Sequence, residues 1–251
     1  MGAMSDLTLH TYSDMCSKDA VAIVGFPSLG LVSSIATGFL AKELKLDLIA
    51  AVSSPAFPPY AIVQNGVPMP PVRIYGGCRK KECDCEGGIE CEDLFVITSE
   101  FVPKPEQTYE LASMIVDWCL NNNVSKIITL DGIPLFGPDM YSIIGVGSTE
   151  NARNMMKEYD IDSVDDGMVR GISGMMLVKS SEIDLDVITL LGSAKQDMPD
   201  PKGAAKLMEP LTRLLPELKI DTEPLYKEAE EIEKKIRNQQ MHQYENQDIY
   251  G

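Results

Sequence analysis

Basic residues are scarce in this chain of 251 residues. Its 22 Lys and Arg stand against 38 Asp and Glu, which gives a formal net charge of −16. Nucleic-acid binding relies on clustered Lys and Arg, so this balance argues against DNA or RNA as a main partner. It favours solubility, and a charged partner is expected to be basic.

Long apolar runs are also missing. No segment approaches the roughly 18 consecutive apolar residues that a membrane-spanning helix needs, and residues 1–6 lack the basic start and apolar run of a signal peptide. Met4 is expected to be the natural start, with residues 1–3 left over from cloning. We therefore expect a cytoplasmic protein without a membrane partner, whose six cysteines are by default reduced thiols or metal ligands.

Histidine is the third shortage. The chain has His10 near its N-terminus and His242 in a polar segment near its C-terminus, and neither follows an expected strand. This placement argues against Ser-His-Asp or Cys-His catalysis. A carboxylate or metal-assisted mechanism stays open, with Asp131 as its first candidate. A turn-forming Asp at the end of a strand is the simpler interpretation of that residue.

The apolar residues that are present follow an α/β pattern. Hydrophobic residues make up 44% of the chain, as in a folded globular protein. Residues 20–25 have the β-branched content of a buried strand, a helix is expected over residues 31–44, and a strand over residues 48–52. This order predicts a βαβ unit and a partly parallel sheet. The proline-rich residues 55–71 form an excursion from it.

The pattern continues through the rest of the core. Further strands are expected at residues 72–75, 94–98, 126–130 and 186–191, and helices after Pro105, over 148–156, from Gly171 and over 201–215. Pro210 should kink the last of these helices or split it.

Three regions follow from this pattern. Residues 4–220 are expected to form one α/β core domain, with residues 76–93 as a cysteine-rich hairpin insertion. Residues 221–236 repeat apolar side chains at helical spacing, as in an exposed amphipathic or coiled-coil helix, and they are expected to form a C-terminal helix that projects from the core. Residues 237–251 are polar and are expected to be a flexible tail.

The loop over residues 25–30 lies between a strand and a helix, where α/β proteins often bind phosphate. It lacks the Lys-Ser/Thr of a P-loop, the spacing of a dinucleotide fingerprint and the Gly-x-Ser-x-Gly pattern that would make Ser28 a nucleophile. The simpler interpretation is that its glycines permit a tight turn and close packing of the helix.

Four cysteines fall within the insertion: Cys78, Cys83, Cys85 and Cys91. Four thiolates could hold zinc or an iron–sulfur cluster. Their spacing fits neither paired C-x-x-C knuckles nor ferredoxin runs, so a solvated hairpin with free thiols or one disulfide is the preferred interpretation. No metal or other cofactor is expected.

The chain ends in Ile249, Tyr250 and Gly251. A hydrophobic residue, a tyrosine and a free carboxylate on a flexible tail make a portable docking peptide. The carboxylate can pair with a Lys, and the tyrosine supplies a large apolar body with a polar tip.

Several segments together resemble the proteasome assembly chaperone 2 family. They are Gly25-Phe26-Pro27-Ser28-Leu29-Gly30-Leu31-Val32, Gly132-Ile133-Pro134, Gly171-Ile172-Ser173-Gly174, and Pro199-Asp200-Pro201 followed by Ala204-Ala205. The resemblance spans roughly residues 7–236 and does not extend to the insertion at 76–93.

The resemblance implies a phosphorylase/hydrolase-like three-layer α/β/α sandwich, a homo-oligomer and no established catalysis. Archaeal members are similar to chaperones or activators that bind the proteasome core particle. In such proteins a hydrophobic–tyrosine–any C-terminus docks between α-ring subunits, and Ile249, Tyr250 and Gly251 match those positions. The resemblance thus implies a non-enzymatic chaperone or activator whose partners are the core-particle α subunits.

Two alternatives remain at this stage. The implied fold is shared with phosphorylases and hydrolases, so a small-molecule enzyme is possible, and it would need a deep pocket with convergent charged groups at Ser28, Asp131 or residues 145–149. A protein that binds metal or senses redox state through the cysteine cluster is the other.

Overall fold

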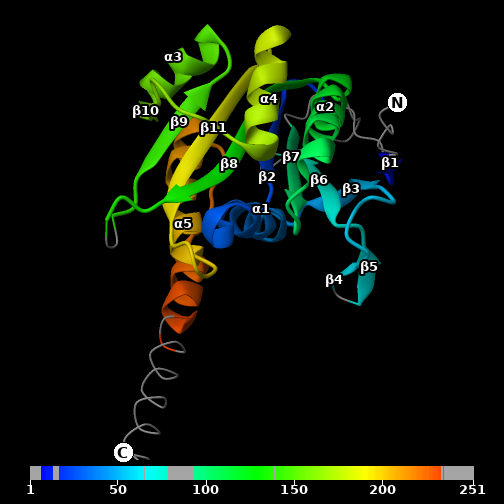
Figure 1. Cartoon of the computed structure of the whole chain (residues 1–251), viewed down its shortest axis with the longest axis horizontal. Helices are drawn as coiled ribbons and strands as arrows, with labels where there is room; N and C mark the ends of the chain where they lie inside the picture. The colour runs from blue at the N-terminus through cyan, green and yellow to red at the C-terminus, as the bar shows by residue number, and fades with distance from the viewer. Residues whose placement is uncertain are drawn as a thin grey trace, which may run out of the picture.

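Figure 1 shows the computed structural model of the chain, which describes residues 7–13, 17–64, 66–78, 93–137, 140–232 and 234. Its main sheet has nine strands in the order β1-β3-β6-β7-β2-β8-β11-β9-β10. These strands are β1 (Thr8–Thr11), β2 (Ala20–Gly25), β3 (Asp47–Ser53), β6 (Val72–Cys78), β7 (Asp93–Ser99), β8 (Val124–Pro134), β9 (Ile143–Gly147), β10 (Asp162–Ser163) and β11 (Asp186–Ala194).

The central strand β2 is buried on both faces. It pairs in parallel with β7 and β8, and β11 continues the parallel run beyond β8. Ala20, Ala22 and Val24 contribute to one hydrophobic cluster, and Val21 and Ile23 to another. Side chains alternate between the two faces of a strand, so a fully apolar strand of this kind must be covered on both sides.

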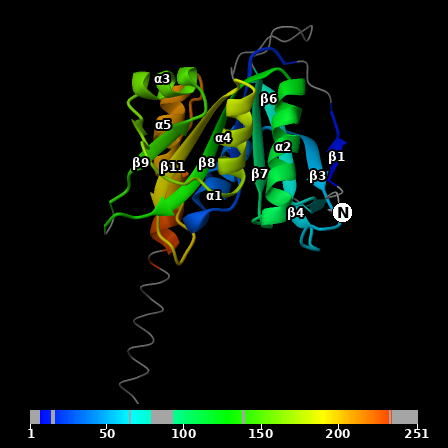
Figure 2. The same ribbon diagram turned by 45° about the horizontal axis from the view of Figure 1, so that its top comes forward.

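Helices supply this cover. One face of the sheet carries α2 (Pro105–Asn121) and α4 (Gly171–Glu182), as Figures 1 and 2 show. The other carries α1 (Val32–Glu43), α3 (Glu150–Glu158) and α5 (Pro201–Leu214). The three-layer α/β/α sandwich that the resemblance implies is confirmed.

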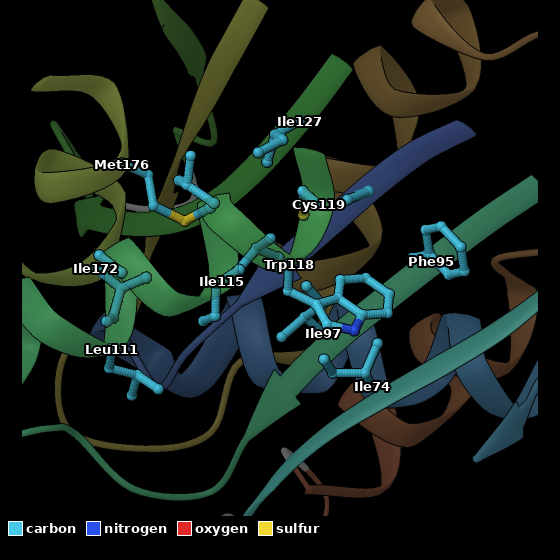
Figure 3. Packing of buried hydrophobic residues seen from close by; sticks show 14 of the residues in the cluster. Ile74, Phe95, Ile97, Leu111, Ile115, Trp118, Cys119, Ile127, Ile172 and Met176 are labelled. Carbon is cyan, nitrogen blue, oxygen red and sulfur yellow. The ribbon is translucent and has the colours of Figure 1, made fainter. Parts of the chain in front are cut away.

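The core beneath α2 and α4 is densely packed (Figure 3). Trp118 of α2 meets Phe95 of β7 edge to face, with 4.9 Å between ring centroids. Leu111 and Ile115 lie on the same side of α2 and are fully buried. Burying such a side chain contributes about 1.5–3 kcal/mol, so this apolar stripe holds α2 on the sheet.

Two details differ from the simplest interpretation of the sequence. β3 runs parallel to β2 but does not pair with it, because β6 and β7 lie between them. Pro210 does not split its helix, since α5 continues from Pro201 to Leu214 with Pro210 buried inside it.

The proline-rich excursion contains a separate two-stranded hairpin. It consists of β4 (Ile62–Gln64) and β5 (Val67–Met69), which pair with each other and not with the main sheet. In Figure 1 this hairpin extends beyond the ends of β3 and β6. Among the described residues, no helix is both long and apolar enough to cross a membrane.

Candidate partner-docking site

The three residues predicted to dock, Ile249, Tyr250 and Gly251, lie outside the described residues, which end at 234. The structure does show the helix that leads toward them, over residues 223–232. The boundaries of this region at 220 and 236, and the tail beyond it, stay predictions.

The helix over residues 223–232 begins with a side-chain cap and packs against the core. The carboxylate of Asp221 accepts a hydrogen bond from the backbone N–H of Glu223 at 3.0 Å. Such a bond satisfies one of the free N–H groups at a helix start. Leu225 and Ala229, spaced four residues apart, are buried, and Leu225 belongs to the cluster beneath α5. Within the described residues, the first part of the predicted apolar stripe, Leu225 and Ala229, therefore faces the body of the protein.

Polar contacts join this helix to α5. The hydroxyl of Tyr226 donates to the Glu209 carboxylate at 3.5 Å, and Lys206 approaches the same carboxylate at 2.7 Å. The Glu209 partner raises the pKa of Lys206. These contacts lie at the surface, so their net contribution is small, and Leu225 is the main anchor.

Asp200 fixes the start of α5 relative to the sheet. Its carboxylate accepts hydrogen bonds from the backbone N–H groups of Lys195 at 2.9 Å and Gly203 at 3.0 Å, and from the Tyr141 hydroxyl at 3.0 Å. Asp200 is 2% exposed, so nearly all of this bonding is shielded from water. The start of α5, the helix against which residues 223–232 pack, is therefore held in a fixed position.

The candidate nucleophile Ser28 is occupied by structural contacts. Its hydroxyl hydrogen-bonds the Ser33 hydroxyl, which donates in turn to the carbonyl oxygen of Phe26 at 2.6 Å. A Cβ placed on Gly132 would lie 2.5 Å from the carbonyl oxygen of Leu29. The loop at 25–30 is thus packed directly on β8.

Asp131 lies close to that loop, at the end of β8. Burial raises the pKa of its carboxyl group, although hydrogen bonds from the Gly132 N–H, at 2.8 Å, and from Ser173 oppose the shift. The sole described histidine, His10, is on β1, with four strands between it and β8, and it contacts Ser53 at 2.7 Å. No described imidazole can therefore act on Ser28 or Asp131.

Residues 145–149 do not converge with these groups. β9 runs antiparallel to β11, which places Gly147 opposite Ile188 near the start of β11. Ser28 and Asp131 lie at the other end of the sheet, where the parallel strands finish. Thr149 caps α3 by accepting from the Ala152 N–H at 3.0 Å and donating to Asp186. Of the three places named for an enzyme pocket, Ser28 and Asp131 thus lie near one another, and residues 145–149 lie apart from both.

A charged hollow of about 600 Å³ lies elsewhere, beside the C-terminal end of α1. Arg73, which lines this hollow, has a side chain that is only 2% exposed and forms a bidentate ion pair with Glu100. Burial alone would lower the pKa of Arg73, but Glu100 and Tyr75 together more than offset this and leave the pKa raised. Because Arg73 also bonds Tyr75 and Pro70, we interpret it as a structural group.

The cysteine prediction is largely untested. Cys78 ends β6 and is half-exposed, while Cys83, Cys85 and Cys91 lie outside the described residues. Cys119 is a core residue of α2, and burial raises the pKa of its thiol. Within the described ranges, no group of His, Cys, Asp and Glu is arranged to hold a metal ion.

The chain is similar to known proteins over nearly its whole length. Residues 22–240 match the PAC2 family. An uncharacterized protein of Methanocaldococcus jannaschii is 30% identical over 220 residues, covering 88% of this chain and 85% of that protein. PbaA of Pyrococcus furiosus, an archaeal homolog of proteasome-assembly chaperone, is 31% identical with a TM-score of 0.82, covering 95% of this chain and 94% of PbaA.

A second solved structure shares the fold. PbaB of Pyrococcus furiosus, an archaeal proteasome activator, is 23% identical with a TM-score of 0.78, and the match covers 94% of this chain and 100% of PbaB.

Proposed function

Because the chain belongs to the PAC2 family, we propose that it is a non-enzymatic proteasome assembly chaperone or activator. The observation that carries this proposal is the likeness to PbaA, which combines sequence identity with a shared fold along almost the entire chain. PbaA is described as a homolog of proteasome-assembly chaperone, and the proposal extends that role to this protein. A cytoplasmic location follows from such a partner.

Docking on the α-ring of the core particle is assigned to Ile249, Tyr250 and Gly251. The Gly251 carboxylate would pair with a lysine of the α-ring, and Tyr250 would pack in the adjoining groove. The helix over residues 223–232 supports this role because Leu225 and Ala229 hold it on the core. The 17 residues after 234 span at most about 60 Å when extended, which is enough to reach a separate surface.

Self-assembly would strengthen this docking. Three terminal residues offer few contacts, so one tail is expected to bind weakly. A homo-oligomer presents several tails to one ring, and each bound tail raises the effective concentration of the next. We therefore propose a homo-oligomer as the binding form.

The absence of catalysis is also part of the proposal. It is supported by the structural bonding of Ser28 and by the position of residues 145–149 at the opposite end of the sheet from Asp131. A pocket enzyme on this fold would need such groups to meet around a substrate.

Binding of purified core particle to the intact chain and to a chain ending at Asp248 tests the function. We expect capture by the intact chain and at least a tenfold loss for the shortened one, because an anchor of this kind contributes about 2 kcal/mol or more. Equal capture by both would place docking elsewhere. No capture by either would contradict a proteasome-directed role.

A further inference from the structure

The charged hollow beside the C-terminal end of α1 combines fixed polar groups with apolar ones. Strands β6 and β7 contribute Arg73, Tyr75 and Thr98, whose side chains are buried. The Tyr75 hydroxyl accepts from the Arg73 guanidinium and donates to Gln64, each at 3.0 Å. Apolar side chains complete the lining: Ala41, Leu46, Leu48 and Met69. Small-molecule sites are typically hollows of about 300–1,000 Å³ with a few placed polar groups, and the volume of about 600 Å³ falls in this range.

Gly38 leaves part of this hollow open. It lies within α1 and lines the hollow, and a Cβ placed on it would meet nothing within 4 Å. Glycine inside a helix lowers stability relative to alanine. No neighbouring atom requires a glycine at this position, so its presence calls for another reason. Room for a bound molecule is such a reason.

Two lysines at the end of α1 bring positive charge to the hollow. Lys42 and Lys45 line it and are exposed, and within the described part of the chain neither forms an ion pair. Lys45 follows the C-cap of α1 with φ of +52°, and its N–H donates to the carbonyl oxygen of Lys42 at 3.1 Å. Glycine usually takes this position, because a Cβ is disfavoured there. A lysine in its place keeps a cation beside the hollow.

The carboxylates of the lining do not cancel this charge. Glu100 is neutralised by Arg73 through their bidentate ion pair. Two lysines then stand against one remaining carboxylate, the exposed Asp47. The lining is thus net positive on a chain whose net charge is −16, and it favours an anion over a cation.

We propose that this hollow binds a small organic anion, with a carboxylate or phosphate group beside Lys42 and Lys45 and an apolar body against Gly38, Leu46 and Met69. The lysines offer charge-assisted hydrogen bonds, which are stronger than neutral ones. The buried polar groups are fixed before binding, so little conformational entropy is lost on association. This site is separate from the C-terminal docking peptide and goes beyond the proposed proteasome function.

Two dyes test the site in the full chain. Anilinonaphthalene sulfonate carries an acidic group on an apolar body, and phenylnaphthylamine has the same body without the charge. Fluorescence titration gives the dissociation constant and the number of dye molecules bound to each chain. We expect a single site for the charged dye, with affinity at least about tenfold higher than for the neutral dye. Benzoate and phenyl phosphate should displace the charged dye, and benzyl alcohol should not.

Variants locate the bound dye. Lys42→Gln with Lys45→Gln should raise the dissociation constant of the charged dye at least about tenfold and that of the neutral dye by less than about twofold. The matched control, Lys157→Gln with Lys219→Gln, removes the same charge at exposed positions outside the hollow and should leave both constants unchanged. Gly38→Phe should abolish binding of both dyes, because its ring would occupy part of the hollow. Gly38→Ala should bind as the unaltered chain does. Thermal unfolding identifies any variant that has lost its fold.

Four results would overturn the inference. Unchanged binding of the charged dye to the Lys42 and Lys45 variant would mean that these lysines only stabilise the end of α1. Unchanged binding to folded Gly38→Phe would place the dye elsewhere. Equal affinity for the two dyes, or no displacement by benzoate and phenyl phosphate, would contradict selection of an anion. No saturable binding to the unaltered chain would mean that the hollow takes no such ligand. None of these results bears on capture of the core particle, so the proposed function is tested separately.

Discussion

The backbone N–H of Asp200 donates a hydrogen bond to the carbonyl oxygen of Gly30, with 2.8 Å between nitrogen and oxygen. Gly30 follows the first buried strand and Asp200 begins α5, so the bond joins early and late parts of the chain. Both residues belong to segments that carry the resemblance to the assembly chaperones. Their role in this structure is to lock the loop after β2 against the start of α5.

Gly30→Ala should destabilise the fold by about 1–3 kcal/mol. Gly30 has φ of +61°, which L side chains rarely adopt, and a Cβ would lie 2.8 Å from the carbonyl oxygen of Lys195. Urea unfolding at equilibrium measures the loss. Gly38→Ala is the matched control, because a Cβ on this glycine in α1 meets nothing within 4 Å. That variant should be about 0.5–1 kcal/mol more stable, and equal effects at the two positions would refute the packing argument.

Features that depend on neighbouring residues could be predicted from the sequence, whereas contacts between distant parts of the chain could not. Residues 20–25 form the expected strand because six consecutive apolar or small residues leave few alternatives, and Pro105 starts α2 because proline suits the first turn of a helix. The contact between Gly30 and Asp200 has no such local signal. It depends on two loops 170 positions apart in sequence, and only the sheet order brings them together.

The placement of strands shows the same limit. The order of β2, α1 and β3 predicted their parallel direction, but not that β6 and β7 would lie between the two strands. Pro210 was expected to disturb α5, yet the helix continues, since the buried face of α5 holds it on the sheet. The docking residues 249–251 were identified from their residue types at the end of the sequence together with the resemblance, and their role is a proposal.

Asp131→Asn should make the protein more stable at neutral pH. Burial raises the pKa of Asp131 in the folded state, so the folded protein binds this proton more tightly than the unfolded chain does. By linkage, the free energy of unfolding falls as the pH rises from the ordinary carboxyl pKa near 4 through the folded-state pKa of Asp131. Below about pH 4 the group is protonated in both states and this loss of stability is absent.

Urea unfolding from about pH 3 to pH 7 measures this difference. The variant should match the unaltered chain at the acid end and exceed it at the neutral end. Asp166→Asn, at an exposed position, serves as the control for the removal of one carboxylate from the chain. A variant that is less stable at pH 7 would mean that the ionised carboxylate is needed by Gly132 and Ser173.

Replacing residues 79–92 with Asn-Gly should leave the fold intact. Cys78 and Asp93 are direct partners at the end of the β6–β7 pair, so a two-residue turn can join them without a change of register. The thermal midpoint should change by no more than a few degrees, since loop shortening of this size alters closure entropy by only about 1–2 kcal/mol.

The same variant discriminates between the two interpretations of the cysteines. Zinc content by atomic emission and absorbance near 400 nm should be alike before and after the replacement if the thiols bind no metal. A large loss of stability, together with loss of bound zinc or of a visible chromophore, would promote a metal-binding role for Cys83, Cys85 and Cys91.

Tyr250→Ala should abolish most of the binding to the proteasome core particle. The proposed docking peptide is too short for a large interface, so a few anchors must supply its affinity. Tyr250 is the single aromatic residue among the last three, and Gly251 offers little beyond its carboxylate. The loss is expected to be about 1–3 kcal/mol for each engaged tail. Avidity multiplies that loss when several tails bind one ring.

Surface-plasmon binding to immobilised core particle gives the measurement, and the tail provides its own control. Tyr244→Ala removes the same side chain six residues earlier and should bind like the unaltered protein. One residue added after Gly251 should weaken binding as Tyr250→Ala does, because it moves the carboxylate away from its cation. Added salt should weaken it further, since that ion pair is screened. If both tyrosine variants and the extended chain bind as the unaltered protein does, docking does not depend on this terminus, and the affinity must come from a surface of the folded core.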